Sequence, residues 1–97
     1  MIHHIVALQA RPESGRVLAA ALADFARNIV YLDGVIEATW GENQNEASGS
    51  LGYSHVLQVL LTEFSTVESY LAYPAHAILS AIIDRTCFGR LVFDFET

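Results

Sequence analysis

The feature that most constrains this chain is the order in which strand-like and helix-like apolar patterns follow one another. Four segments are rich in β-branched and aromatic residues and alternate as strands do: residues 2–8, 35–40, 53–62 and 88–95. Between the first two, apolar residues recur at helical spacing as far as Leu32, and Asp33 and Gly34 are expected to end that helix. Helical segments also separate the last two strands. The order βαββαβ predicts an α+β chain with a ferredoxin-like fold, a four-stranded antiparallel sheet with its helices on one face.

The predicted helices have recognisable starts. Ser14 or a neighbouring residue is expected to cap the first helix. Ser65 and Glu68 have the spacing of a capping box, which predicts a short helix at about residues 66–72. Pro74 has no N–H group to donate, so it either opens another helix at the first position or kinks a continuous one.

The composition predicts that the chain does not function as a monomer. Its 97 residues are typical of one domain, spanning residues 1–97. Charged residues make up 16% of the chain and hydrophobic residues 53%, whereas globular domains average about 25% charged residues. Helices cover only one face of a ferredoxin-like sheet, and the other face is apolar here as well. We therefore expect a homodimer formed through the open sheet face, which would be a dimeric α+β barrel.

Charge and motif content exclude several classes of function. The net charge is −6, with five Lys and Arg residues, Arg11 and Arg16 among them, against eleven Asp and Glu residues, which disfavours nucleic-acid binding. No apolar run reaches the roughly 18 residues that span a bilayer, so we expect no membrane association. Cys87 is the only cysteine, which excludes an internal disulfide and favours a reducing, cytoplasmic location. No dinucleotide or phosphate-loop glycine motif is present, so we expect no cofactor.

Tyr70 and His76 are the strongest candidates for chemistry. They lie close together in an otherwise apolar helical region and supply a proton donor and a group that titrates near neutral pH. Burial would leave the imidazole neutral and able to accept a proton, while the phenol could polarise a carbonyl. The alternative is that both are structural side chains hydrogen-bonded within the core.

The histidines also raise the question of a metal site. The chain contains four of them: His3, His4, His55 and His76. No local ligand spacing such as His-x-x-x-His is present, and strand alternation turns His3 and His4 to opposite faces. We therefore expect no bound metal. If His4 and His55 share a face of the two central strands, they could approach each other beneath the helix that carries His76. Trp40 is expected to be a pocket wall. Residues 41–52 are expected to form a long loop or a strand extension; this is the only segment that could act as a lid, and a surface loop without a function is the alternative.

Four stretches of the chain resemble one known family. They are His3-His4-Ile5-Val6, Gly52-Tyr53-Ser54-His55, Tyr70-Leu71-Ala72-Tyr73-Pro74-Ala75-His76 and Leu91-Val92-Phe93-Asp94-Phe95. In this order and at these separations they are similar to the stress-responsive A/B barrel domain. The resemblance spans essentially the whole chain and implies a dimeric α+β barrel of ferredoxin-like protomers.

The resemblance also implies roles for particular residues. The family includes heat-stable plant proteins and a plant polyketide cyclase in which a histidine and a tyrosine catalyse an aldol ring closure. By motif position these correspond to His76 and Tyr70. His4 and His55 fall where further pocket histidines lie, and Tyr73, which replaces a common family histidine, is expected to line the same pocket.

We therefore expect a pocket for a small apolar carbonyl or polyketide-like compound, with cofactor-free lyase or cyclase chemistry. A non-enzymatic stress-responsive or structural protein is the alternative. A cofactor-independent monooxygenase, a role that related dimeric barrels adopt, is the third hypothesis.

Overall fold

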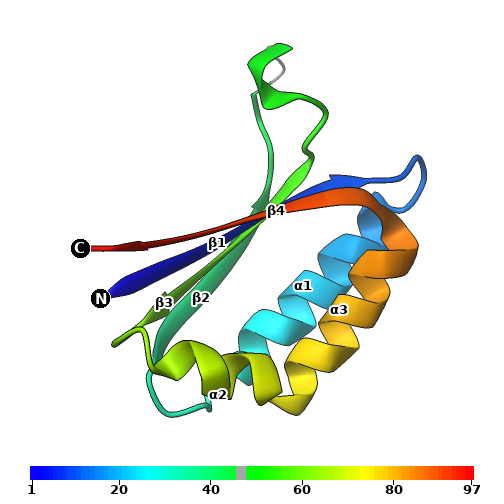
Figure 1. The fold of residues 1–97 in the computed structure, drawn as a ribbon. Helices are drawn as coiled ribbons and strands as arrows, with labels where there is room; N and C mark the ends of the chain where they lie inside the picture. The colour runs from blue at the N-terminus through cyan, green and yellow to red at the C-terminus, as the bar shows by residue number, and fades with distance from the viewer. Residues whose placement is uncertain (46–47) are drawn as a thin grey trace.

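The computed structural model describes residues 1–45 and 48–97 and confirms the predicted order of elements. The elements are β1 (Ile2–Ala10), α1 (Gly15–Ile29), β2 (Val35–Glu42), the short 3-10 helix η1 (Ser48–Ser50), β3 (His55–Leu61), α2 (Thr66–Ala72), α3 (Pro74–Thr86) and β4 (Cys87–Glu96). The strands form one antiparallel sheet in the order β2-β3-β1-β4. Helices α1 and α3 lie side by side against one face of the sheet, and α2 lies at one end (Figure 1).

The core lies between the sheet and the helices. Alternate residues of the two central strands face the helices and are buried: Ile2, His4, Val6 and Leu8 of β1, and His55, Leu57, Val59 and Leu61 of β3. The apolar stripe of α1 packs onto them through Leu18, Leu22, Phe25 and Ile29. Each such apolar side chain stabilises the fold by about 1.5–3 kcal/mol when it is fully buried. The two polar residues among these buried positions of the central strands, both histidines, therefore stand out within the core.

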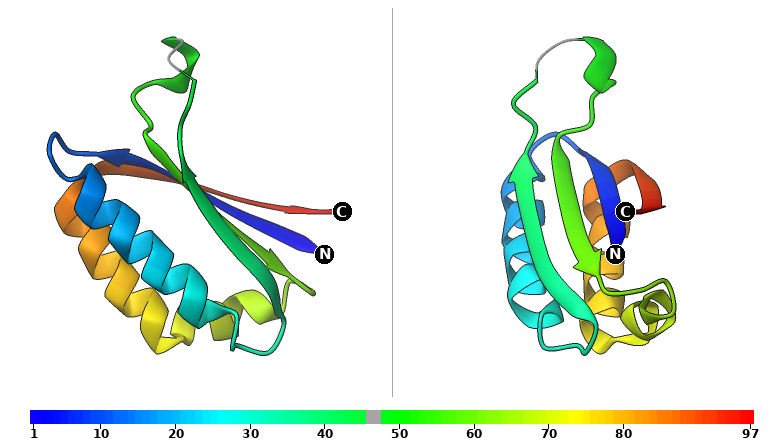
Figure 2. Two further views of the ribbon diagram at one scale, coloured as in Figure 1. Left: turned by 180° about the vertical axis from the view of Figure 1, so that it is seen from behind. Right: turned by 90° about the vertical axis from the view of Figure 1, so that its left-hand side faces the viewer.

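The opposite face of the sheet is apolar but is not covered by α1 and α3, which lie behind the sheet in the right-hand view of Figure 2. Four of its apolar side chains are between 37% and 57% exposed: Val56, Leu91, Phe93 and Phe95. His3 lies on this face, where its ring stacks on Phe95 with centroids 4.5 Å apart. This face has the apolar character that the sequence predicted.

The first helix ends earlier than predicted. We expected Asp33 and Gly34 to stop it, but α1 ends at Ile29 and the chain then turns. The N–H of Tyr31 donates to the carbonyl of Asn28, and the N–H of Leu32 donates to that of Ile29. This turn carries Leu32 back against the core, which is why its spacing resembled a continued helix. Gly34 instead occupies the left-handed region, with φ of 92°, which glycine adopts at little cost.

The predicted side-chain caps are not formed. Ser14 and Ser65 precede α1 and α2, but neither side chain makes a capping hydrogen bond. Both residues have right-handed helical dihedrals, whereas a capping side chain requires an extended N-cap. The prediction for Pro74 is confirmed in its first form, since it opens α3 at the first position. Tyr73 before it is extended, with ψ of 134°, as the proline ring favours.

The segment between β2 and β3 projects beyond the end of the sheet (Figure 1). Strand β2 runs on to Glu42, and β3 begins at His55, two residues later than predicted. The predicted long loop or strand extension at 41–52 thus includes the end of β2 and η1, while its residues 46–47 lie outside the described ranges. No helix in the described part of the chain is long and apolar enough to cross a membrane.

Candidate functional site

Three of the predicted residues meet at one place between the sheet and the helices. His4 comes from β1, Tyr70 from α2 and His76 from α3. The ring of Tyr70 contacts both imidazoles, with its centroid 4.9 Å from that of His4 and 5.2 Å from that of His76. Both contacts are edge-on, at 65°. The structure therefore brings together one phenol and two imidazoles from three separate elements.

The break between α2 and α3 explains how Tyr70 and His76 come to face each other. On one continuous helix, positions six residues apart do not share a face. Here the extended Tyr73 ends α2, and Pro74 begins α3 with its ring-fixed φ already helical. The N–H of His76 donates to the carbonyl of Tyr73 in the first turn of α3. The new helix direction places His76 against the buried ring of Tyr70.

A carboxylate orients His4. The Nδ1 of His4 lies 2.6 Å from Oδ1 of Asp94 on the neighbouring strand β4. In a neutral imidazole, Nδ1–H donating to a carboxylate leaves Nε2 as the acceptor nitrogen. Strand pairing brings the two residues opposite each other and on one face of the sheet, so the register of β1 with β4 sets this contact and the orientation of the His4 ring.

The electrostatic surroundings of Tyr70 and His76 shift their pKa values in opposite directions. Burial, followed by the nearby negative charge of Asp94, raises the pKa of Tyr70 above its ordinary value of 10.0. Burial first, then His4 and Arg90, lower the pKa of His76 below its ordinary 6.5. Near neutral pH the phenol therefore keeps its proton and the imidazole lacks one. This combination provides one hydrogen-bond donor and one proton acceptor for acid–base chemistry.

The three rings border a cavity of about 220 Å³. Its apolar wall consists of Val6, Leu57, Leu71, Leu79, Ile83 and Val92. Its polar side chains are His4, Tyr70, His76, Ser80 and Arg90. A mostly apolar cavity with a few convergent polar groups is the usual form of a small-molecule site.

The structure places the other predicted pocket residues elsewhere. His55 faces the helices as His4 does, but it pairs with Leu8 whereas His4 pairs with Val59. Four residues along a strand separate the two imidazoles by roughly 13 Å, so they do not approach each other beneath α3. His55 lies instead against Ser54, with its Nδ1 2.8 Å from the hydroxyl.

Trp40 and Tyr73 also lie outside the cavity that holds Tyr70 and His76. Trp40 is 36% exposed on β2, an edge strand of the sheet. Tyr73 borders a shallow surface depression beside Pro74 and Ile78, on the side of α3 that faces α1. Neither side chain lines the 220 Å³ cavity.

Sequence reasoning missed Asp94, Arg90 and Ser80. Arg90, Val92 and Asp94 occupy every second position of β4 and share the side that faces the helices. This spacing could have shown from the sequence that Arg90 and Asp94 lie on one face. Ser80 follows His76 by four residues, which places it on the same face of α3. Among the residues that the structure describes, no three His, Cys, Asp or Glu side chains are grouped so that they could hold a metal ion.

Fold and site together define a ferredoxin-like α+β protein with a mostly apolar cavity bordered by one tyrosine and two histidines. The chain belongs to the stress-responsive A/B barrel domain family, whose model matches residues 2–97. It is similar to olivetolic acid cyclase from Cannabis sativa, with 24% identity over 98 residues that cover 97% of this chain and 94% of the relative.

Solved structures show the same fold. A dimeric ferredoxin-like protein of unknown function from Jannaschia sp. CCS1 superimposes with a TM-score of 0.88 and 23% identity, over 99% of this chain and 98% of that chain. A candidate antibiotic biosynthesis monooxygenase from Nitrosomonas europaea has a TM-score of 0.86 and 8% identity, over 100% of this chain and 98% of that chain. These likenesses confirm the predicted ferredoxin-like fold.

Proposed function

We propose that this protein binds a small, largely apolar carbonyl compound in the 220 Å³ cavity and catalyses its cofactor-free cyclisation or cleavage. The observation that carries the proposal is the contact of Tyr70 with His76, 5.2 Å between ring centroids, with their pKa values shifted apart. The similarity to olivetolic acid cyclase supports cyclisation as the reaction type. The apolar wall suits the hydrocarbon part of such a ligand.

The chemistry that we propose uses each group in its expected protonation state. His76 removes a proton from the carbon next to a carbonyl, while the Tyr70 hydroxyl donates a hydrogen bond to the carbonyl oxygen as it becomes an enolate. The enolate carbon attacks a second carbonyl of the same molecule, which closes a ring and forms an alkoxide. The imidazolium of His76 then returns its proton to that alkoxide. Loss of water from the aldol product, followed by enolisation of the two remaining ketones, gives the aromatic ring.

A linear heptanetrione tests this reaction, because its aldol closure between the terminal methyl carbon and the distant ketone yields methylresorcinol and water. We expect the wild-type protein to accelerate formation of the resorcinol, measured by chromatography and mass spectrometry. His76→Gln should lower that rate by about a hundredfold or more, since the proton acceptor is lost. His55→Gln is the matched control, because it makes the same replacement at a buried histidine that lies outside the cavity.

The alternatives give different results in the same preparation. A non-enzymatic structural protein would show no resorcinol above the uncatalysed rate, and His76→Gln would only lower the melting temperature. A cofactor-independent monooxygenase would consume oxygen with a quinol substrate. This alternative is included because the fold is similar to that of the Nitrosomonas protein. Oxygen uptake without resorcinol formation would replace the cyclase proposal.

We also propose that two copies associate through the open face of the sheet. The face bears exposed apolar side chains on β4, including Phe93 at 57% and Phe95 at 48% exposure, and exposed apolar patches of this kind mark interaction surfaces. A second copy is favoured because the similar protein from Jannaschia is described as dimeric.

Substitution on that face tests the dimer. Phe93→Asp should convert a two-chain species into a monomer in sedimentation velocity, because a buried carboxylate would have no partner in an apolar interface. Phe64→Asp is the matched control, since Phe64 is 65% exposed but lies in the turn between β3 and α2. A monomeric wild-type protein, or a dimeric Phe93→Asp variant, would contradict this arrangement.

A further inference from the structure

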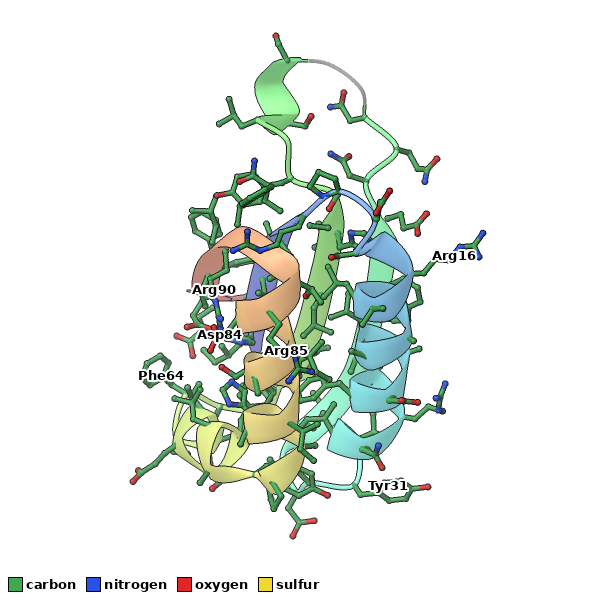
Figure 3. All side chains as sticks on the ribbon, turned by 90° about the vertical axis from the view of Figure 1, so that its right-hand side faces the viewer. Arg16, Tyr31, Phe64, Asp84, Arg85 and Arg90 are labelled. Carbon is green, nitrogen blue, oxygen red and sulfur yellow. The ribbon has the colours of Figure 1, made fainter. Side chains whose placement is uncertain are left out.

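Arg90 gives the cavity a charge that the proposed carbonyl chemistry does not use. It lies on β4 opposite Leu8 of β1, on the side of the sheet that faces the helices. Arg90 is the only side chain with a fixed charge among the described residues that line the cavity. Figure 3 shows Arg90 and Asp84 close together beside α3, whereas the nearby Arg85 lies on a different side of that helix.

Two side chains of α3 hold the guanidinium in place. Arg90 forms an ion pair with Asp84 through Nη2, and its Nη1 lies 3.4 Å from the hydroxyl of Ser80. A guanidinium carries five N–H donors, so these two contacts in the described structure leave most of its donor capacity for another partner. Ser80 and Arg90 both line the cavity. The arginine is therefore oriented by polar contacts, and it retains donors for a ligand.

The ion pair with Asp84 is weaker than a contact with a bound ligand would be. The side chain of Asp84 is 68% exposed and that of Arg90 is 35% exposed. Water and salt weaken such exposed pairs, which typically contribute about 0–1 kcal/mol. A carboxylate inside the apolar cavity would be shielded from water, and it matches the planar fork of a guanidinium with two parallel hydrogen bonds.

The spacing along α3 relates the arginine to the reacting groups. His76, Ser80 and Asp84 follow one another at intervals of four residues, so all three lie on one side of the helix. Four residues correspond to roughly 6 Å along a helix axis. A group bound at Arg90 beside Ser80 would thus lie on the order of one helical turn from the imidazole of His76.

From this geometry we propose that Arg90 binds a carboxylate of the ligand, so that the cavity takes an apolar carbonyl compound that also carries a carboxylate. This inference rests on the proposed small-molecule function of the same cavity. The carboxylate anchors the ligand about one helical turn from His76, and the hydrocarbon part packs on Leu57, Leu79 and Val92. Neutral compounds of the same shape would lack the anchor.

A pair of probes that differ in one group tests the proposal: para-butylbenzoate and its neutral analogue para-butylbenzamide. Binding to the full chain is measured by calorimetry or by chemical shifts in NMR. We expect the wild-type protein to bind the carboxylate about tenfold or more tightly than the amide, as a hydrogen-bonded charge predicts. Arg90→Leu and Arg90→Gln should abolish this preference and leave amide binding within about twofold.

Two further variants separate the cavity arginine from general effects of charge. Arg85→Leu removes the same charge from an exposed position outside the cavity, so it should retain the preference for the carboxylate. Asp84→Asn removes the competing partner, so it should strengthen carboxylate binding severalfold.

The outcomes distinguish this inference from the proposed function. Equal binding of both probes to the wild-type protein would overturn the anion site and leave the apolar cavity intact as a ligand site. A preference that persists in both Arg90 variants, or that is lost in Arg85→Leu, would also overturn the role of Arg90. Failure of both probes to bind would count against the cavity as a small-molecule site, and with it against both proposals.

Discussion

Replacing Tyr70 with phenylalanine separates its chemical role from its structural one. Its side chain is 1% exposed, and its ring contacts the rings of His4, Phe25 and His76 at centroid distances of 4.9, 5.9 and 5.2 Å. Phenylalanine keeps the ring and all three contacts, and only the hydroxyl is lost. The free energy of unfolding should therefore change by no more than about 1 kcal/mol.

The corresponding truncation sets the scale for a structural effect. Tyr70→Ala removes a fully buried ring from the core and should cost about 3–5 kcal/mol. In a domain of this length, about 1 kcal/mol corresponds to about 4–8 °C in melting temperature. Scanning calorimetry should thus show a small shift for Tyr70→Phe and a loss of well over 10 °C, as an order of magnitude, for Tyr70→Ala.

The proposed chemistry responds differently to the same change. Loss of the hydroxyl that donates to the developing enolate oxygen should lower kcat for heptanetrione closure by about a hundredfold to a thousandfold. Tyr73→Phe is the matched control, because Tyr73 lies outside the cavity and should retain activity. A Tyr70→Phe variant with kcat within about twofold of wild type would refute the role of the hydroxyl. A melting temperature as low as that of Tyr70→Ala would refute the packing argument.

Gly34→Ala should lower the free energy of unfolding by about 1–3 kcal/mol. The reason is that φ is positive at this position and the added Cβ would lie 2.6 Å from a side chain of α2. Denaturant titration measures this free energy. Gly49→Ala, where the added Cβ meets nothing within 4 Å, should change it by less than about 0.5 kcal/mol. Asp94→Asn should reduce heptanetrione turnover about tenfold or more, because it removes the charge that orients His4, whose ring packs on the reacting Tyr70; unchanged turnover would contradict that positioning role. Since the pKa of His76 is lowered, activity in a pH profile should begin to fall only below the ordinary value of 6.5. Below 6.5 the unfolded chain binds the His76 proton more readily, so stability should rise with pH there, and His76→Gln should flatten that slope.

The alternating patterns were sufficient to predict the sheet and its two faces. Alternation along the first strand turned His3 and His4 to opposite faces, and the structure buries His4 against the helices while His3 stacks on Phe95 of the open face. The end of α1 could not be read in the same way, because Leu32 keeps the helical spacing while a turn carries it to the core. Periodicity reports which residues are buried, but a turn and a helix can bury the same residue.

The same limit applies to the site. Tyr70, His76 and His4 were predicted to cluster, and the structure places them in one cavity. His55 was assigned to the correct face but not to the correct place, because alternation defines a side of the sheet and not a position along it. The position along the sheet is set by the register of β1 against β3 and β4, and that register depends on contacts between distant parts of the chain.

Strand β4 links the cavity to the proposed dimer. It is an edge strand, hydrogen-bonded within the protomer only to β1 in the described sheet. One of its faces carries Arg90, which is the charged residue of the cavity, and Asp94, which orients His4. The other face carries Phe93 and Phe95. Covering the second face by another copy would restrain the same strand whose first face positions the polar groups. Association and ligand binding would then be coupled through β4, because neither face can move without the other.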